Sequence, residues 1–483
     1  MCGIFGAVGN RNIVEDIYIG MMHLQHRGQD AAGMAVYDNE RHYVHIVKDN
    51  GYVDAVMNDA RKRDVQGTIG IGFTRYPTVG TGSVEEVQPF FLQHPDGIAL
   101  AFNGNIVNYL SQKKRLLKNR RYLTSNCDAE VLLHVFADEY AKKDSNHSFF
   151  KAVKKVYSKI VGAYSVVGMI ADKGVFAFRD PKGIRPLIMG QNNGAIAFAS
   201  ESNALINQGY HDLRSIMPGE AVFVDKKLHV DLRIIETSKH AHCIFEWVYF
   251  SAAESTIENK PVYTVRENLG KELAKKVRRM WPGLKPDLVI PVPDTSRPAA
   301  SALATALKVP YGEGLVKNRY IGRTFIMPTQ RIREHAMSLK LKPIETMIRG
   351  KKIMVVDDSI VRGTTSKKII KLLREAGAKE VYFLSTFPPI RNPCYYGIDF
   401  QHREDLIAHD KTIPQIEKEI GADRLIYMDK EGLQRAAGIQ DLCMACVTGK
   451  YVTPIKEATN LEKLRKQHIK EREDRSVVRI NRK

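Results

Sequence analysis

The second residue of the chain is a cysteine, in the opening MCGIFGAVGN. If Met1 is removed, Cys2 carries a free α-amine beside its own thiol. That amine has a reference pKa of about 7.7–8.0, so near neutral pH it can accept the thiol proton. Cys2 would then supply both a nucleophile and its base, and only Met1 need be removed. A cysteine at position 2 can equally be incidental, so its role has to be judged from the other motifs of the chain.

A second candidate site lies in the stretch VVDDSIVRGTTS (355–366). Asp357 and Asp358 stand where a buried strand ends, and open α/β sheets bind their ligands at that edge. The residues Arg362, Gly363, Thr364, Thr365 and Ser366 then open a helix, whose free N–H groups suit an anion. Two acids do not hold phosphate themselves, so they suit ribose hydroxyls or Mg²⁺. The alternative is a simple capping loop, and the stretch is not a Walker A loop.

Four cysteines form a third candidate site. Cys443 and Cys446 make a CxxC pair, which Cys243 and Cys394 can complete. Four thiolates without histidine suit zinc or an iron–sulfur cluster, and buried free thiols are a further alternative. The remaining cysteine, Cys127, is interpreted as a packing residue.

Composition sets limits on the kind of protein that carries these sites. At 483 residues the chain exceeds one ordinary core, so we expect two domains. No stretch reaches the roughly 20 apolar residues of a membrane span, and no secretion signal is present, so we expect a cytoplasmic protein. The net charge of +19 is spread over patches such as KKRLLKNRR (113–121) and a basic tail. Without zinc-finger spacing or a ribonucleoprotein motif, nucleic acid is not the expected partner.

The elements that must position these residues differ between the two halves. The first 230 or so residues are rich in short apolar runs such as GIFGAVG, TIGIGFTR and GIALAFNGNIV, with helical patterns near 12–25 and 128–142. This pattern predicts sheets flanked by helices. In the second half, strands such as DLVIPVPD (287–294) alternate with helices, which predicts a parallel α/β sheet. The boundary falls near 235–255.

The first half resembles the N-terminal-nucleophile (type 2) glutamine amidotransferase domain. The resemblance rests on CGIFG, HRGQDAAG (26–33), GFTRYPTVG (72–80), FNGNIVN (102–108) and SNCDAE (125–130), in that order. It implies a four-layer αββα Ntn-hydrolase fold over residues 2–235, with Cys2 as nucleophile. Asn103 and Gly104 resemble the family's oxyanion donors, and glutamine would meet Arg75, Asp128, Arg27 and Gly28. For Arg27, a structural role is as well supported as a substrate contact.

The second half resembles the type I phosphoribosyltransferases over residues 245–455. Asp357 and Asp358 would meet the ribose, and Arg362 to Ser366 would hold the 5′-phosphate of phosphoribosyl pyrophosphate. Ser359 is expected to bind the same substrate. PVPDTS (291–296) resembles the pyrophosphate loop, with Asp294 beside Mg²⁺ together with Asp357 and Asp358. KNRYIGRTFIMPTQRIRE (317–334) resembles the loop that closes over the substrate, and contributes Lys317 and Arg323.

The two domains in this order resemble the phosphoribosylpyrophosphate amidotransferases, glycosyltransferases that open de novo purine synthesis. The resemblance implies that ammonia from glutamine replaces pyrophosphate, giving 5-phosphoribosylamine. It also implies a [4Fe–4S] cluster on Cys243, Cys394, Cys443 and Cys446, because CVTGKY (446–451) fits members that carry one. A homotetramer or dimer and feedback inhibition by purine nucleotides are further expectations. The basic tail, 456–483, is not interpreted.

Three stretches depart from the family pattern. FSAAES (250–255) has Ala252 and Ala253 in place of an Arg–Pro pair, Ser338 stands where an arginine is expected, and PVPDTSRP replaces the commoner PVPDSG. These departures leave two alternatives open. One is a paralogue with a different phosphosugar or acceptor. The other is a catalytically silent protein that acts in regulation or binds nucleic acid.

Overall fold

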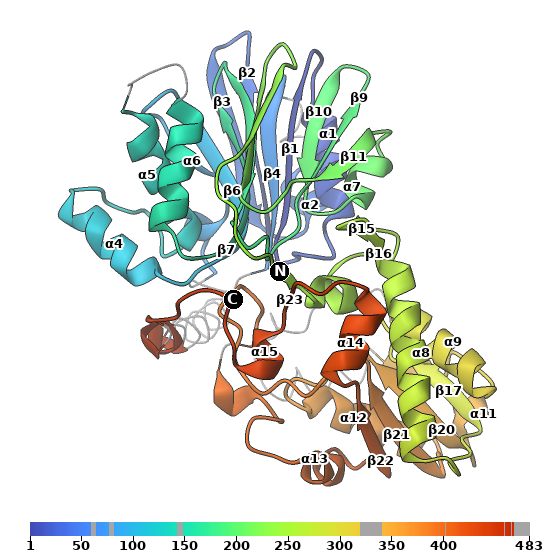
Figure 1. The fold of residues 1–483 in the computed structure, drawn as a ribbon. Coiled ribbons are helices and arrows are strands. Elements are labelled where there is room, and N and C mark those ends of the chain that lie inside the picture. The colour runs from blue at the N-terminus through green and yellow to red at the C-terminus, as the bar shows by residue number, and fades with distance from the viewer. Residues whose placement is uncertain are drawn as a thin grey trace, which may run out of the picture.

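The structure is a computed structural model that describes residues 1–58, 64–76, 82–142, 148–318, 341–400, 402–457, 459–464 and 466–467. These residues form two domains, and the N-terminus lies where the domains meet (Figure 1). None of the helices in this described part is both long and apolar enough to cross a bilayer.

Two antiparallel sheets form the centre of the first domain. Within the described residues, one sheet has the order β11-β9-β10-β1-β4-β2-β3 and the other β13-β12-β8-β7-β6-β5. The strands of the first are β1 (Gly3–Gly9), β2 (Ala31–Asp38), β3 (Tyr43–Asn50), β4 (Ile69–Arg75), β9 (Ile188–Asn192), β10 (Ala195–Ala199) and β11 (His211–Ser215). Those of the second are β5 (Phe90–Leu92), β6 (Ile98–Ile106), β7 (Gly162–Ile170), β8 (Gly174–Arg179), β12 (Glu220–Asp225) and β13 (Val230–Ile234). The central strands are buried on both faces, which explains their continuous apolar runs.

Helices cover the outer face of each sheet. The first sheet packs against α1 (Val14–His23), α2 (Val53–Val56) and α7 (Asn203–Ile206). The second packs against α4 (Tyr109–Lys118), α5 (Asp128–Tyr140) and α6 (Ser148–Lys159). A third apolar cluster, with Ile71 and Val167 among its members, fills the space between the sheets. The order of layers is therefore helix, sheet, sheet, helix, which confirms the predicted αββα domain.

The second domain contains a parallel sheet in the order β17-β20-β21-β22. Its strands are β17 (Leu288–Pro291), β20 (Lys352–Asp357), β21 (Glu380–Ser385) and β22 (Arg424–Tyr427). Met354 and Val356 of β20 face α8 (Val262–Met280), α9 (Arg297–Leu307) and α14 (Lys430–Ala437). Ile353 and Val355 face α11 (Glu345–Ile348), α12 (Thr364–Glu375) and α13 (Ile413–Ile420). The alternation of one strand between two helix layers confirms the predicted α/β domain.

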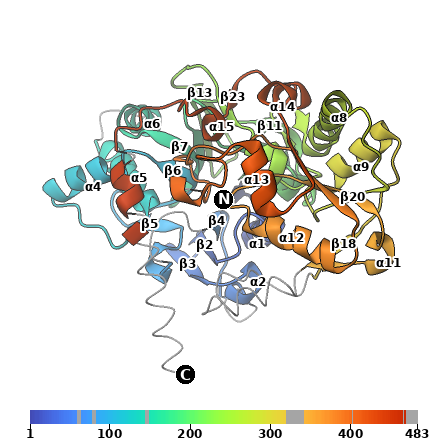
Figure 2. The ribbon, with the colours of Figure 1, turned by 90° about the horizontal axis from the view of Figure 1, so that it is seen from below.

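Short elements join the two domains. β14 (His242–Cys243) pairs with β23 (Leu442–Cys443) in parallel, η2 (Glu246–Phe250) is a π-helical turn, and α15 (Ala445–Thr448) follows β23. Figure 1 places β23 and α15 at the junction of the domains, and Figures 1 and 2 both draw these two elements close together. The largest apolar cluster runs through this junction and contains residues of both domains, such as Tyr164 and Leu384.

Candidate active sites

Cys2 lies immediately before β1, the central strand of the first sheet. Its partly buried thiol donates a hydrogen bond to the Tyr76 carbonyl oxygen at 3.6 Å. Burial raises the pKa of this thiol, and the positive N-terminus and Arg75 offset part of the effect. A thiol that is neutral in this setting needs a base before it can attack a carbonyl carbon. Met1 is 3% exposed and shares an apolar cluster with Phe102 and Cys127, so its removal would free buried volume beside Cys2.

Asn103 and Gly104 lie on β6, in the facing sheet. Asn103 is 0% exposed, and neither Nδ2 nor Oδ1 has a hydrogen-bond partner among the described residues. A buried amide without a partner costs free energy, which is tolerated where the group serves a ligand. A Cβ on Gly104 would lie 1.9 Å from the Ala163 carbonyl oxygen, so close pairing with β7 requires glycine there. This arrangement suits a pair of oxyanion donors.

Arg75 and Asp128 are both buried, and both lie near enough to influence the Cys2 charge. Arg75 ends β4, and its Nη2 atom lies 3.0 Å from Glu86 Oε2. Asp128 opens α5, and its Oδ2 atom accepts a hydrogen bond of 2.9 Å from the Ile106 N–H. The two charges of opposite sign match the two ends of an α-amino acid. Their contacts with glutamine remain predictions.

Arg27 contacts the backbone of Cys2, and its guanidinium is fully buried. Its Nε donates to the Cys2 carbonyl oxygen at 2.9 Å, Nη1 to Glu201 at 2.6 Å and Nη2 to Glu246 at 2.9 Å. These bonds favour the structural role for Arg27 over a substrate contact. A Cβ on Gly28 would lie 2.5 Å from the Thr74 carbonyl carbon, so glycine lets this loop lie directly on the end of β4.

In the second domain, Asp357 ends β20 and Asp358 follows it. Thr295 Oγ1 and Ser359 Oγ donate to the two oxygens of Asp358 at 2.6 and 2.7 Å. Burial and the charge of Asp358 raise the pKa of Asp357 well above its usual range. Burial also raises the pKa of Asp358, although the two hydroxyls oppose this shift. Two buried carboxyl groups that repel each other are suited to hydroxyl groups or a divalent cation.

The predicted phosphate loop opens α12 as expected. Gly363 adopts φ +75°, and a Cβ there would lie 2.3 Å from Ile407 Cδ1, so only glycine suits this position. Thr364 and Thr365 begin the helix and Ser366 is buried. Arg362 is directed toward Asp405, with Nη2 3.1 Å from Oδ2.

Asp294, the predicted third magnesium ligand, is surrounded by cations. Arg297 Nη1 lies 2.6 Å from Oδ1 and Lys317 Nζ lies 3.0 Å from Oδ2. Arg297 belongs to the departure PVPDTSRP, and it also contacts Glu313 at 3.1 Å. Arg323 and Ser338 lie outside the described residues.

The four predicted cysteine ligands are all buried and gather at the domain junction. Cys243 and Cys443 are paired neighbours of β14 and β23. The N–H groups of Arg391 and Asn392 bind the Cys446 carbonyl oxygen at 3.0 Å, which brings the Cys394 segment to α15. All six cysteines are free thiols. Burial raises the pKa of Cys243 to about 11, with the charges of Glu246 and Cys394 contributing.

Across the part of the chain that the structure describes, no three His, Cys, Asp or Glu side chains are grouped so that they could hold a metal ion. The side chains named above for magnesium and for a cluster therefore remain candidates.

Two structural features near the candidate sites were not predicted from the sequence. Glu201 and Glu246 bind Arg27, but they are 174 and 219 residues away from it in the chain, and no local pattern links them. Arg266 lies on the buried face of α8 with Val262, Val265 and Leu269. That i, i+3, i+4 spacing was a usable helical signal, and it would have placed Arg266 toward the core.

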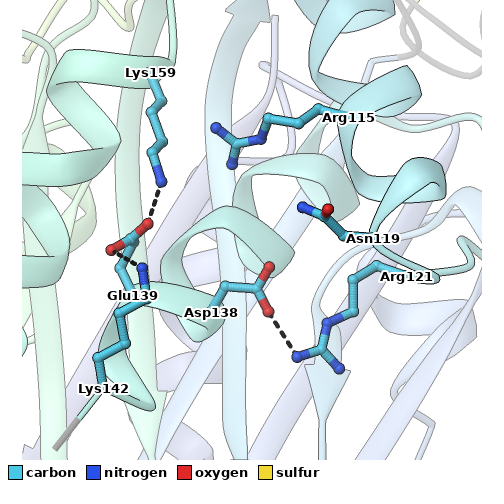
Figure 3. A pocket seen from close by; sticks show the side chains of 7 residues that line it. All are labelled: Arg115, Asn119, Arg121, Asp138, Glu139, Lys142 and Lys159. Carbon is cyan, nitrogen blue, oxygen red and sulfur yellow. Dashed lines mark hydrogen bonds and ion pairs between the residues drawn. The ribbon is translucent and has the colours of Figure 1, made fainter.

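An open recess of about 460 Å³ lies on the first domain, away from these sites (Figure 3). Arg121 pairs with Asp138 at 2.9 Å, and Lys142 and Lys159 both pair with Glu139. α4, α5 and α6 all end beside it, and helix C-termini attract cations. The cations of the recess are therefore explained by the fold, and we assign it no ligand.

Comparisons with known proteins agree with this two-domain architecture. A glutamine amidotransferase domain model matches residues 78–207, and a phosphoribosyl transferase domain model matches residues 264–402. An amidophosphoribosyltransferase of Pseudomonas aeruginosa is 44% identical, over 94% of this chain and 93% of its own. That of Saccharomyces cerevisiae is 39% identical, over 95% and 93%.

Solved structures match at similar coverage. The B. subtilis glutamine phosphoribosylpyrophosphate amidotransferase, complexed with ADP and GMP, superposes with a TM-score of 0.85 at 37% identity, covering 94% of this chain and 98% of its own. A structure described as the allosteric regulatory enzyme of purine biosynthesis gives 0.87 at 37% identity, with 96% and 99% covered. With identities near 40% over nearly the whole length, this chain belongs to the amidophosphoribosyltransferase family.

Proposed function

We propose that this protein hydrolyses glutamine at Cys2 and transfers the ammonia to 5-phosphoribosyl 1-pyrophosphate. The products are 5-phosphoribosylamine, pyrophosphate and glutamate, the first step of de novo purine synthesis. The observation that carries the proposal is the buried, unpartnered Asn103 amide on the strand that faces Cys2. The acid pair and phosphate loop of the second domain support the acceptor half.

At the first site, the α-amine of Cys2 would take the thiol proton once Met1 is gone. The thiolate then attacks the side-chain amide carbon of glutamine, and the oxyanion receives hydrogen bonds from Asn103 Nδ2 and the Gly104 N–H. The protonated amine returns its proton to the departing nitrogen, which leaves as ammonia. Water hydrolyses the resulting thioester to glutamate. Arg75 and Asp128 would hold the α-carboxylate and α-ammonium groups.

At the second site, Asp357 and Asp358 would bind the ribose hydroxyls, while the N-terminus of α12 holds the 5′-phosphate. Ammonia attacks C1 of the ribose as pyrophosphate leaves. Lys317, which lies on Asp294, is placed to meet the leaving group's negative charge. Ser359 and Thr295 orient Asp358 through their hydroxyls.

Mg²⁺ is the cofactor we propose at this site. The mutual repulsion of two buried carboxyl groups is what a divalent cation relieves, so Asp357 and Asp358 fit it. When bound, it would neutralise charge on the pyrophosphate. Asp294 would join only if Arg297 and Lys317 release its oxygens.

For the four-cysteine site we propose a [4Fe–4S] cluster on Cys243, Cys394, Cys443 and Cys446. The support is the donor type: four buried free thiols from segments far apart in sequence, with no histidine, are the ligands that such a cluster takes, although the described side chains are not grouped closely enough to hold a metal ion. Its role would be structural, because it would join the segments that connect the domains.

We further propose a cytoplasmic homo-oligomer, a tetramer or dimer, that purine nucleotides inhibit. For the inhibition, the support is that a B. subtilis relative was solved with ADP and GMP. Inhibition of turnover by these nucleotides tests that part, and the mass of the protein in solution tests the oligomer.

The decisive experiment measures pyrophosphate release from phosphoribosyl pyrophosphate, with glutamine or ammonia as nitrogen donor. Wild-type protein should use both donors, and Cys2→Ala only ammonia. Turnover with a different phosphosugar alone would favour a paralogue. No turnover with either donor, together with salt-dependent nucleic-acid binding, would favour the silent alternative.

A further inference from the structure

Two acids and two cations meet at the loop that follows β17. Arg297, the first residue of α9, contacts Asp294 through Nη1 at 2.6 Å and Glu313 through Nε at 3.1 Å. Lys317 ends β18 (Leu315–Lys317), and its Nζ lies 3.0 Å from the other oxygen of Asp294. These four side chains are 35–44% exposed, so a ligand in solution can reach them.

This group of charges lies beside the acid pair of the second site. β17 and β20 are neighbouring parallel strands, and the Val292 N–H binds the Val356 carbonyl oxygen at 2.8 Å where they end. Thr295, from the loop after β17, donates through Oγ1 to Asp358 Oδ2 at 2.6 Å. Loops that follow adjacent parallel strands share one edge of the sheet. The two cations therefore belong to the same edge as the acid pair, and Thr295 joins their loop to it.

The shape of the sugar places the leaving group on this side of the site. In phosphoribosyl pyrophosphate, C1 carries pyrophosphate, C2 and C3 carry hydroxyls, and C5 carries the phosphate. If the acid pair holds the hydroxyls, pyrophosphate is bonded to the carbon next to them, at the opposite end of the sugar from the 5′-phosphate. With the 5′-phosphate on α12, the pyrophosphate falls on the loop that Thr295 joins to Asp358.

Both cations keep donors that are available for such a group. Arg297 uses Nη1 and Nε for the two acids, and its Nη2 has no hydrogen-bond partner among the described residues. Lys317 uses one of its three N–H groups, on Asp294. Ser296, which precedes α9, is 1% exposed, and its Oγ has no partner in the described part of the chain. Arginine suits phosphoryl oxygens because its planar guanidinium can donate two parallel hydrogen bonds.

Asp294 is placed to hold the cations rather than a metal ion. Each of its two oxygens contacts one cation, at 2.6 and 3.0 Å, whereas a magnesium ligand needs an oxygen that is free for the metal. Glu313 contacts Arg297 from the other side, and Tyr311 donates to Glu313 Oε1 at 2.5 Å. Arg297 is therefore fixed between two acids, with its third nitrogen left for a ligand.

We propose that Arg297 is a further catalytic residue of the second site, and that it binds the departing pyrophosphate together with Lys317. Asp294 and Glu313 are positioning residues that hold these cations, and Asp294 is not a magnesium ligand. As the bond from C1 to the pyrophosphate oxygen breaks, its electron pair passes to that oxygen, ammonia forms the new bond to C1, and the nitrogen releases a proton to water. The hydrogen bonds from Arg297 strengthen as negative charge grows on the pyrophosphate. This inference rests on the proposed function for the identity of the sugar.

The test uses the full chain and the variants Arg297→Met, Arg297→Lys and Asp294→Asn. Arg374→Met is the matched control, because the Arg374 side chain is 35% exposed, against 38% for Arg297, and pairs with Asp423 at the opposite edge of the sheet. Calorimetry with MgCl₂ measures the binding of inorganic pyrophosphate and of ribose 5-phosphate, which has the hydroxyls and the 5′-phosphate but no leaving group. Pyrophosphate release with ammonia gives kcat and KM for phosphoribosyl pyrophosphate.

In Arg297→Met, the affinity for pyrophosphate and kcat with ammonia should each fall about tenfold, as expected for losing one charge-assisted hydrogen bond. Arg297→Lys keeps the charge and should lose less. Binding of ribose 5-phosphate should stay within about twofold in every variant, and Arg374→Met should match the wild type throughout. In Asp294→Asn, the affinity for pyrophosphate should fall, but MgCl₂ should still increase the melting temperature, because the acid pair holds the metal.

No pyrophosphate binding in the wild type, or equal binding in Arg297→Met, overturns the inference. A parallel loss of ribose 5-phosphate binding also overturns it, because the substitution then disturbs the whole site. Loss of the MgCl₂ effect in Asp294→Asn makes Asp294 a metal ligand. If the wild type binds pyrophosphate but releases none from phosphoribosyl pyrophosphate with ammonia, the proposed function fails. In that case, pyrophosphate binding by Arg297→Met still decides the role of Arg297.

Discussion

Replacing Asn103 by alanine should separate the activity of the glutamine site from the stability of the fold. Asn103 is fully buried on β6, and neither polar atom of its amide has a partner among the described residues. A group in this state serves a ligand and contributes little to the folded protein itself. Asn103→Ala therefore removes a hydrogen bond that forms only while the oxyanion exists.

The expected effect on kcat differs in sign and size from the expected effect on the free energy of unfolding. Loss of one oxyanion donor typically lowers kcat by about 10²–10³, or about 3–4 kcal/mol. A buried amide without a partner costs about 1–3 kcal/mol, and alanine removes that cost while leaving a small cavity. The free energy of unfolding should thus change by about 1 kcal/mol or less, or increase.

The matched control is Asn105→Ala, two residues further along the same strand. Asn105 Nδ2 donates to the Tyr395 carbonyl oxygen at 2.9 Å, so this substitution leaves a buried acceptor without its donor. It should lower stability by about 1–3 kcal/mol without a hundredfold loss of glutaminase kcat. Glutamate formation, ammonia-dependent pyrophosphate release and urea unfolding would be measured for both variants.

Two outcomes would refute the reasoning. If Asn103→Ala loses less than about tenfold in kcat for glutamine, Asn103 is not an oxyanion donor. If ammonia-dependent turnover falls in parallel, the substitution acts on the whole protein rather than on the first site.

Three further predictions concern the N-terminus, the metal and pH. A residue inserted between Met1 and Cys2 that blocks removal of Met1 leaves Cys2 without a free α-amine. This insertion should abolish glutamine-dependent turnover and spare ammonia-dependent turnover. Unchanged glutamine turnover would exclude that amine as the base. Without Mg²⁺, Asp357→Asn should raise the melting temperature, because two buried carboxyl groups no longer repel each other. The substitution should also abolish the increase in melting temperature that MgCl₂ causes in the wild type. An equal increase in both proteins would place the metal elsewhere. Burial opposes ionisation of Glu201, but His26 and Arg27 outweigh it and hold its pKa at about 2. At pH values above the unfolded-state pKa of about 4.3, this depressed pKa contributes about 3 kcal/mol to the free energy of unfolding. That contribution is lost as the pH falls toward 2. The difference in melting temperature between wild type and Glu201→Gln should therefore shrink between pH 6 and pH 3, and a constant difference would contradict the assignment.

Several parts of the fold and sites could be predicted because their signals are local. The buried run ending at Asp357 predicted β20, and the stretch after it predicted the start of α12 at Thr364. A Cβ on Gly104 or Gly363 would strike neighbouring atoms, a constraint that only the structure reveals. Other elements were missed although a pattern existed, as in α8.

The ambiguity of Arg27 could not be resolved from its neighbours in HRGQD. A guanidinium can meet a substrate carboxylate or a buried glutamate equally well, and its choice depends on which acid the fold brings to it. The same holds for Asp294, whose local motif suggested a metal but whose oxygens bind Arg297 and Lys317.

The sequence by itself determined the two domain types and predicted Cys2 and the stretch 362–366 as candidate site residues, because each rests on residues close together in the chain whose chemistry is specific. Only the tertiary structure decided how the sites are joined. The buried network of Arg27, Glu201 and Glu246 is built from residues about 170 to 220 positions apart. Contacts over such separations arise from the packing of one domain on the other, and no local spacing records them.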